Sequence, residues 1–189
     1  MRYDKGHKEA SRRRIMEVAG ERFRSDGIAA SGLATIMSDA GLTNGAFYPH
    51  FKSKAELVRE SVAAAMEDQV KLMGSGGLEA AIDAYLSASH RDNPATGCTL
   101  AALLPELARQ PAETREVWAE RFLAAVNKLG AGLSPQAPDP EGAAIGIYAT
   151  LIGALQLARV RRGRRHASNN RRAERRAASL RSRAAARCA

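Results

Sequence analysis

The chain has 189 residues, of which 45% are hydrophobic and 5% aromatic, and its formal net charge is +9. This length fits one domain or a small domain joined to a larger one, and abundant alanine with few aromatic residues favours helices. Two cysteines, Cys98 and Cys188, are too few for a disulfide framework and lack metal-ligand spacing. The polar N-terminus and the lack of a long apolar run predict that there is no signal peptide and no membrane span. With so few cysteines, we expect a reduced, cytoplasmic protein that needs no metal or cofactor.

Charge divides the chain into three parts. Residues 1–54 carry a net charge of +4, residues 55–158 a net charge of −6, and residues 159–189 a net charge of +11, from 12 arginines and one acid. Basic segments suit nucleic-acid contacts, but they are also common as solvated surfaces. Charge alone therefore does not choose between these two interpretations.

The first predicted helix covers residues 8–25 and ends at Gly27. Its apolar residues recur at helical spacing and form one stripe, made of Ile15, Val18, Ala19 and Phe23. Arginines, including the run Arg12 to Arg14, lie largely around this stripe. That run is either a solvated face or one that faces phosphate groups.

Residues 31–50 predict a helix-turn-helix. Ser31 can cap a second helix, and Gly41 ends that helix at a sharp turn that requires a positive φ. Thr43 can cap a third helix, which stays short because Pro49 donates no backbone hydrogen bond. The third helix is expected to be held in place by two buried aromatic residues, Phe47 and Phe51.

The rest of the chain predicts further helices and no strand. Ser53 and Glu56 have the spacing of a capping box, which opens a helix running to about residue 73. Glycine and proline then separate the remaining predicted helices. These cover residues 78–89, 98–109, 111–130 and 141–162.

The stretch SGLATIMSDAGLTNGAFYPHFKSKAEL, residues 31–57, follows a basic helix. Together they resemble the DNA-binding domain of the TetR family of transcriptional regulators over residues 8–58. The resemblance implies an all-α fold, in which a three-helix helix-turn-helix domain precedes a helical effector-binding and dimerisation domain at residues 59–162. Residues 163–189 form a segment rich in arginine and alanine, which is either a native dimer helix or an altered C-terminus such as a shifted reading frame would produce.

The resemblance also implies DNA contacts. In the family, residues at these positions meet base edges and phosphates, and here they are Ser31, Thr43, Asn44, Gly45, Ala46, Tyr48, His50 and Lys54. Many relatives carry Lys in place of Asn44 and a hydroxyl in place of Ala46, which bears on the operator sequence. His50 is alternatively a partly buried structural histidine.

Nine residues of the second domain either line an apolar ligand cavity or belong to the core: Tyr85, Cys98, Leu103, Glu106, Leu107, Trp118, Phe122, Ile147 and Leu151. Glu106 lies on an otherwise apolar helix and is the group expected to orient a ligand. Cys98 follows Gly97 at the start of a helix, as either a sensor thiol or a buried structural thiol.

These features predict a ligand-responsive repressor that binds a double-stranded DNA operator and is released by a small apolar molecule. We expect a homodimer held by an apolar face in residues 143–158. Two alternatives stay open: a nonspecific nucleic-acid-binding protein that uses the arginine-rich tail, and an enzyme that uses Cys98 with His90. The sequence contains no recognisable catalytic motif, so we expect no enzyme.

Overall fold

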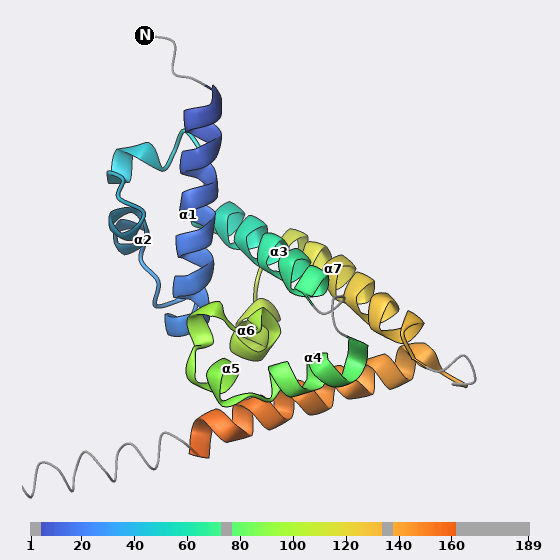
Figure 1. The fold of residues 1–189 in the computed structure, drawn as a ribbon. Helices are drawn as coiled ribbons and strands as arrows, with labels where there is room; N and C mark the ends of the chain where they lie inside the picture. The colour runs from blue at the N-terminus through green and yellow to red at the C-terminus, as the bar shows by residue number, and fades with distance from the viewer. Residues whose placement is uncertain (1–4, 73–76, 134–137, 162–189) are drawn as a thin grey trace, which may run out of the picture.

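The computed structural model describes residues 5–72, 77–133 and 138–161, and the elements within these ranges are helices (Figure 1). No strand occurs among the described residues. The predicted all-α class is therefore confirmed. The predictions for residues 163–189 lie outside the described residues.

The N-terminal part is built from three elements and the start of a fourth. The long helix α1 (Lys5–Asp26) lies beside α2 (Leu33–Asp39) and the 3-10 turn η1 (Asn44–Ala46), as Figure 1 shows. The predicted stripe of α1 is buried, with Ile15, Ala19 and Phe23 fully covered. It packs with Ile36 and Met37 of α2 in an apolar cluster that continues into the second part of the chain through Leu103 and Leu107.

The helix α3 (Lys54–Leu72) connects this part to the rest, because it packs against both α1 and α7. Its start confirms the Ser53 half of the predicted capping box, whereas the Glu56 carboxylate takes the amide one residue before Ser53. The Ser53 hydroxyl accepts a hydrogen bond from the Glu56 amide at 3.1 Å, and the Glu56 carboxylate accepts one from the Lys52 amide at 2.6 Å. The boundary predicted at residues 58–59 falls inside α3, so two domains divided there would share one helix.

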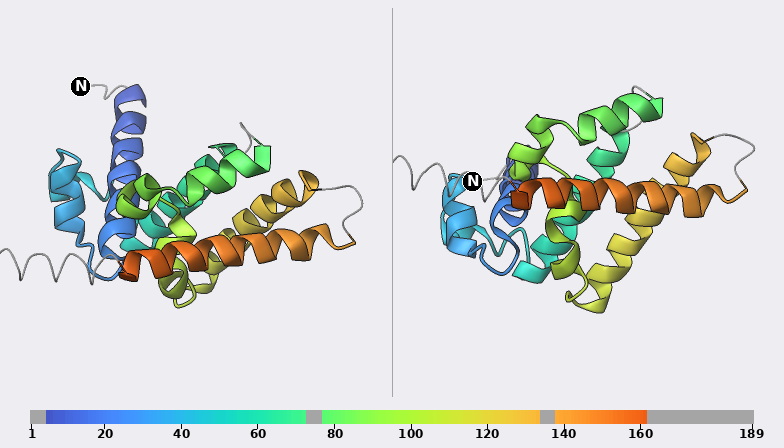
Figure 2. Two further views of the ribbon diagram at one scale, coloured as in Figure 1. Left: turned by 60° about the horizontal axis from the view of Figure 1, so that its bottom comes forward. Right: turned by 90° about the horizontal axis from the view of Figure 1, so that it is seen from below.

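The second part contains the remaining elements: α4 (Gly77–Tyr85), α5 (Ala88–Asp92), the 3-10 turn η2 (Pro94–Thr96), α6 (Thr99–Leu107), α7 (Ala112–Ala131) and a helix at Pro140–Arg161. The views of Figure 2 show the Pro140–Arg161 helix running along one side of the molecule. Arg159, near its end, donates hydrogen bonds to the carbonyls of His90 and Arg91 at 3.1 Å each. These bonds hold the end of this helix against α5.

The single helix predicted at residues 78–89 is wrong. The structure ends α4 at Tyr85 and opens α5 at Ala88. Ser87 is extended between them, and its hydroxyl accepts a hydrogen bond from the His90 amide at 3.1 Å. The side chain of Ser87 thus caps α5, which favours a break over a continuous helix.

The Pro140–Arg161 helix is long and apolar enough to cross a membrane, which differs from the expectation drawn from the sequence. Within the described residues, 22% of its most apolar window is buried. One helix of this kind is weak evidence for a membrane span. What it does establish is apolar surface that the described part of the chain leaves uncovered.

Candidate nucleic-acid interface

The turn between α2 and η1 has the geometry of a helix-turn-helix. Gly41 follows the end of α2 with a φ of +73°, which confirms the positive φ expected there. The Leu42 amide donates to the Met37 carbonyl at 2.9 Å and closes the turn. The next element therefore starts within two residues of the turn.

The third helix is shorter than predicted. Instead of an α-helix from Thr43, the structure has the 3-10 turn η1 followed by further turns to His50. Pro49 supplies no amide donor, so the hydrogen bond to the carbonyl four residues earlier is lost. The segment opens with i→i−3 bonds instead, such as that from the Ala46 amide to the Thr43 carbonyl at 3.0 Å. Thr43 occupies the position before η1, but its side chain makes no capping hydrogen bond.

Two aromatic residues fix this short segment on the domain. Phe47 and Phe51 are 2% and 1% exposed, and their stacked rings have centroids 5.6 Å apart. The Arg12 guanidinium lies 4.7 Å from the centroid of the Phe51 ring and pairs with Glu60 of α3. The predicted aromatic anchors are thus confirmed, and they hold the turn without a long helix.

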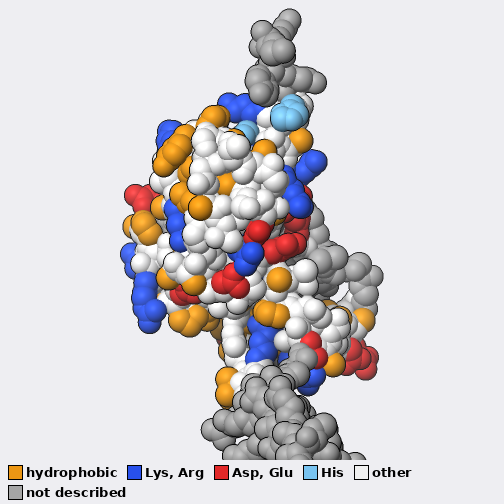
Figure 3. All heavy atoms as spheres, turned by 90° about the vertical axis from the view of Figure 1, so that its left-hand side faces the viewer, with side chains coloured by type: hydrophobic (Ala, Val, Ile, Leu, Met, Phe, Trp, Pro, Cys, Tyr) orange, Lys and Arg blue, Asp and Glu red, His pale blue; other side chains and the backbone are white. Residues whose placement is uncertain are grey.

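The outward side of this anchored segment carries most of the predicted contact residues. Thr43, Asn44 and Gly45 are exposed, and Tyr48 is 71% exposed with its ring edge against Phe47. Ala46 is half-buried. On the face shown in Figure 3, lysine and arginine side chains lie at the margins of a largely uncharged patch. Thr43, Asn44, Gly45 and Tyr48 are therefore accessible to a partner molecule.

Ser31 lies elsewhere than its prediction requires. It is 4% exposed, and its hydroxyl donates to the Gly27 carbonyl at 2.7 Å. The N-cap of α2 is Gly32, with no side-chain capping bond, so the prediction that Ser31 caps this helix is wrong. The physical reason is local: a carbonyl at the end of α1 is closer to the Ser31 hydroxyl than the amides of α2 are.

Lys54 has a partner inside the chain. Its ammonium donates to the Ile28 carbonyl at 2.6 Å and is half-buried. The sequence placed this cation in the first turn of a helix, where the dipole opposes it and a phosphate would help. A backbone oxygen fills that role in the structure.

His50 is half-buried, and its Nδ1 is buried without a hydrogen-bond partner. Burial lowers the pKa of His50, and the positive charges of Lys8 and Arg12 lower it further. The ring is therefore neutral near pH 7. Of the predicted phosphate contacts, Tyr48 is exposed on this surface, whereas Ser31, His50 and Lys54 are partly or wholly covered.

The sequence model described as "Bacterial regulatory proteins, tetR family" matches residues 15–61, which span α1, α2, η1 and the start of α3. Over these residues the chain is similar to the DNA-binding part of TetR-family regulators.

Curated relatives match a segment of similar length. The HTH-type transcriptional regulator TtgR of Pseudomonas putida is 42% identical over 59 residues, which are 31% of this chain and 28% of TtgR. The HTH-type transcriptional regulator AcrR of Shigella flexneri is 37% identical over 59 residues, 31% of this chain and 27% of AcrR. The matched segment is thus less than a third of either TetR-family relative.

Solved structures extend the likeness to the whole fold. The reduced form of E. coli NemR has a TM-score of 0.67 at 19% identity, covering 81% of this chain and 89% of NemR. A TetR-family regulator from Agrobacterium tumefaciens has a TM-score of 0.67 at 20% identity, covering 80% and 88%. At these identities the likeness establishes the TetR-family fold and nothing finer.

One peptide group joins the helix-turn-helix to the second part of the chain. The Glu106 carboxylate of α6 accepts a hydrogen bond from the Ala29 amide at 3.1 Å. The Ile28 carbonyl, in the same peptide group, accepts from Lys54 of α3 at 2.6 Å. A negative and a positive side chain thus hold the two ends of one backbone dipole, which we call the 28–29 clamp.

Glu106 was predicted to orient a ligand, but in the structure it bonds to the backbone of the same chain. Its carboxylate faces the loop after α1, and Glu106 Oε1 lies 2.8 Å from where a side chain at Gly27 would begin. This contact could not be predicted from the sequence, because Ala29 is 77 positions away from Glu106. A glutamate on an otherwise apolar helix indicates that this residue has a polar partner, but it does not show that the partner is the Ala29 amide.

Most of the predicted ligand-pocket residues belong to the core. Cys98, Leu103 and Leu107 are 8%, 1% and 1% exposed within one apolar cluster. Other members of the predicted set pack around that cluster or are buried nearby: Tyr85, Trp118, Phe122 and Leu151. Ile147 is half-buried. Leu107 and Trp118 also line a hollow of 350 Å³ between α6 and α7.

The two residues considered as a catalytic pair do not face each other as thiol and base. The Nε2 atom of His90 accepts a hydrogen bond from the Cys98 amide at 2.9 Å, and Nδ1 lies 2.6 Å from the Tyr85 carbonyl. Both ring nitrogens therefore have backbone partners. Burial raises the pKa of Tyr148 to about 12, with Cys98 contributing, and burial also raises the pKa of Tyr85.

A metal site is not formed by the described residues, since none of them cluster as three or more histidine, cysteine, aspartate or glutamate side chains. The sequence also missed a second contact between the two parts of the chain. Arg24 of α1 donates to the Ala95 carbonyl of η2 at 2.5 Å. An arginine on the side of an amphipathic helix carries no sequence signal for such a bond.

Proposed function

We propose that this chain is a DNA-binding transcriptional regulator whose η1 segment enters the major groove. One observation carries the proposal: Thr43, Asn44, Gly45 and Tyr48 are exposed on a short turn that buried Phe47 and Phe51 hold rigidly. The match of residues 15–61 to the TetR-family model supports it, as do the names of the curated relatives. In this proposal Asn44 reads a base edge, Ala46 contacts a thymine methyl, and Tyr48 contacts phosphate.

The remaining predicted contacts keep different roles in the proposal. His50 and Lys54 are half-buried beside the η1 segment, and they would contact phosphate only after a local rearrangement. Ser31 is left out as a side-chain contact because its hydroxyl is buried and bonded. Gly45 allows the backbone of η1 to lie close to DNA, since no other group lies within 4 Å of the place a side chain would take.

The regulator we propose is a cytoplasmic homodimer that represses transcription and releases its operator when a small apolar ligand binds. Residues 8–58 would form its DNA-binding domain and residues 59–162 its effector and dimer domain. The neighbour SmeT, with a TM-score of 0.51 at 24% identity over 80% of this chain and 81% of SmeT, is described as a triclosan complex. That ligand is small and apolar, which supports the same class here.

The dimer surface we propose differs from the one expected from sequence. Four residues of the expected face are buried in the chain itself: Ala144, Tyr148, Leu151 and Leu155. The opposite side of the Pro140–Arg161 helix exposes Leu157 at 69% and Val160 at 66%, and Ile145, at the flank of that side, is 41% exposed. We assign the contact with a second copy to this exposed apolar side.

The test of the regulator is selection of bound fragments from the source genome by the full chain, followed by titration of one selected fragment and a scrambled one. At physiological salt we expect about 10³-fold or greater preference for the selected fragment. Binding without preference, lost as salt rises, would favour the nonspecific tail-driven alternative instead. Sedimentation of the full chain and of Leu157→Glu tests the dimer, which the added charge should weaken.

A further inference from the structure

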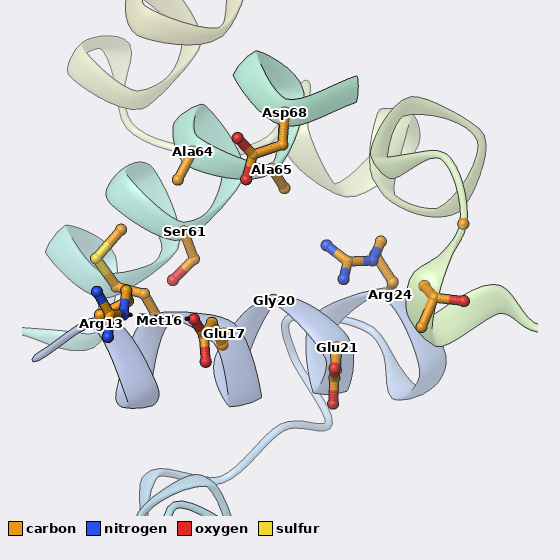
Figure 4. A pocket seen from close by; sticks show the side chains of 12 residues that line it. Arg13, Met16, Glu17, Gly20, Glu21, Arg24, Ser61, Ala64, Ala65 and Asp68 are labelled. Atoms are coloured by element: carbon orange, nitrogen blue, oxygen red, sulfur yellow. Dashed lines mark ion pairs between the residues drawn. The ribbon is translucent and has the colours of Figure 1, made fainter. Parts of the chain in front are cut away.

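A hollow of 410 Å³ lies between α1, α3 and η2, away from the exposed η1 segment (Figure 4). Three small residues, Gly20 of α1 and Ala64 and Ala65 of α3, line it and leave the space between the two helices unfilled. Met16 adds an apolar wall. Cavities of this size hold small organic molecules in other proteins.

One buried hydroxyl faces the hollow without a partner. Ser61 is 2% exposed, and its Oγ makes no hydrogen bond within the described part of the chain. In Figure 4 this side chain points from α3 into the space toward α1. A buried hydroxyl that has given up water without gaining another partner is unfavourable, so a bound polar atom at this point would stabilise the site.

A positive charge faces the same hollow. The half-buried Arg24 donates from Nε to the Ala95 carbonyl at 2.5 Å and forms no ion pair with a described residue. Its guanidinium has further N–H donors, for which the described residues supply no hydrogen-bond acceptor. Burial lowers the pKa of Arg24, partly offset by the charge of Glu21. A partly desolvated guanidinium of this kind is best paired by a carboxylate.

The acids around the hollow limit the charge of the ligand. Glu17 is paired with Arg13 at 3.7 Å, and Asp68 has an interaction of its own. Glu21 lies one helical turn before Arg24 and shares its field. These carboxylates would repel a doubly charged anion such as phosphate more strongly than a singly charged one.

We propose that this hollow binds a small monocarboxylate with an apolar body. The carboxylate pairs with Arg24 and accepts a hydrogen bond from Ser61, and the apolar body lies against Met16, Ala64 and Ala65. The inference concerns binding alone and does not depend on DNA recognition. It also assigns a ligand to the junction of α1 and α3, whereas the cavity expected from sequence lay in the second part of the chain.

Three probes with the same body separate the possible ligand charges: 4-phenylbutyrate, 4-phenylbutylamine and 4-phenylbutanol. Calorimetric titration of the full chain should show 4-phenylbutyrate binding with a dissociation constant of about 1 mM or lower. The alcohol should bind about tenfold more weakly, because it cannot pair with Arg24. The amine and inorganic phosphate should show no saturable binding.

Variants locate the site. Ser61→Ala should lower the affinity for 4-phenylbutyrate by about fivefold, since it removes one hydrogen bond to a charged group. Arg24→Gln should weaken it by about tenfold or more, and Ala64→Leu should abolish it by filling the space. The matched controls are Arg14→Gln, on the same helix but outside the hollow, and Ser38→Ala, exposed on α2.

Thermal melts of every variant show which of them fold as the parent does. If Arg24→Gln unfolds, Ser61→Ala and Ala64→Leu still decide the matter. Equal affinity for the amine and the butyrate, binding that Ser61→Ala and Ala64→Leu leave unchanged, or no butyrate binding up to about 10 mM would each overturn the proposal.

Discussion

The two parts of this chain use their buried residues differently. In the N-terminal part, buried residues such as Phe47 and Phe51 support a turn whose neighbours are exposed, so support and contact alternate along a few positions. In the second part, Cys98, Leu103 and Leu107 pack on one another within the core. An exposed surface can be predicted from sequence when the buried residues that hold it in place are its neighbours along the chain.

The largest effect should come from the local support. Phe47→Ala removes a fully buried aromatic ring and should lower the free energy of unfolding by about 3–5 kcal/mol, measured by denaturant titration. Tyr48→Ala, one residue along and 71% exposed, should change that free energy by less than about 0.5 kcal/mol. A similar loss of unfolding free energy in both variants would mean that Tyr48 also holds the turn in place, as Phe47 does.

A smaller loss should follow from Gly27→Ala. Gly27 has a φ of +89°, and an added Cβ would lie 2.8 Å from Glu106 Oε1, so the variant should be destabilised by about 1–3 kcal/mol. Gly45→Ala is the control, since its φ is not positive and no other group lies within 4 Å. Thermal melts of the two variants compare them directly, and an unaffected Gly27→Ala would contradict the close approach of α6.

DNA binding should separate two exposed residues. Tyr48→Ala should weaken binding to selected and unselected DNA alike, by about 1–3 kcal/mol, because a phosphate contact carries no sequence information. Asn44→Ala should instead change base preference at one position of the operator. Titrations against single-base variants of a selected fragment measure both effects, and identical profiles for the two variants would remove their assigned roles.

The 28–29 clamp should have a moderate effect on stability. Glu106→Gln keeps an acceptor oxygen but loses the charge, and it should cost about 1 kcal/mol. Lys54→Met should cost a similar amount, with little change in DNA affinity if its ammonium stays on the Ile28 carbonyl. A double-mutant cycle measures whether the two residues act on the same peptide group, in which case their effects should not add.

The smallest effect should come from Cys98. Its side chain is 8% exposed, so a mild oxidant should change DNA binding little in the parent chain. Cys98→Ser should give the same response. Loss of DNA binding on oxidation, abolished by Cys98→Ser, would show that Cys98 is a sensor thiol after all.

Features fixed by nearby residues could be predicted from the sequence. The stripe from Ile15 to Phe23, the Ser53 half of the capping box and the positive φ of Gly41 each depend on a few consecutive positions, and each is present. The helical class followed from composition and periodicity. The same local signals, taken with the resemblance, also indicated that Thr43, Asn44 and Tyr48 would lie on the turn.

Features that depend on distant partners could not be predicted. Ser31 bonds to Gly27 rather than to α2, and Glu106 bonds to the Ala29 amide rather than to a ligand. An apolar side chain such as Leu107 suits a core and a cavity equally well, so pattern alone does not separate them. The hollow beside Ser61 is lined by residues of α1, α3 and η2, so no single segment of the sequence indicates it.

The 28–29 clamp also gives the molecule a built-in reporter. Ala29 is an exposed residue, yet its amide proton points at the Glu106 carboxylate of a helix 77 positions later in the chain. Its exchange with deuterated solvent should be slow while α6 stays in place and should become fast when α6 shifts. A single amide resonance thus measures how often the two parts of the chain come apart, whichever ligand or DNA is bound.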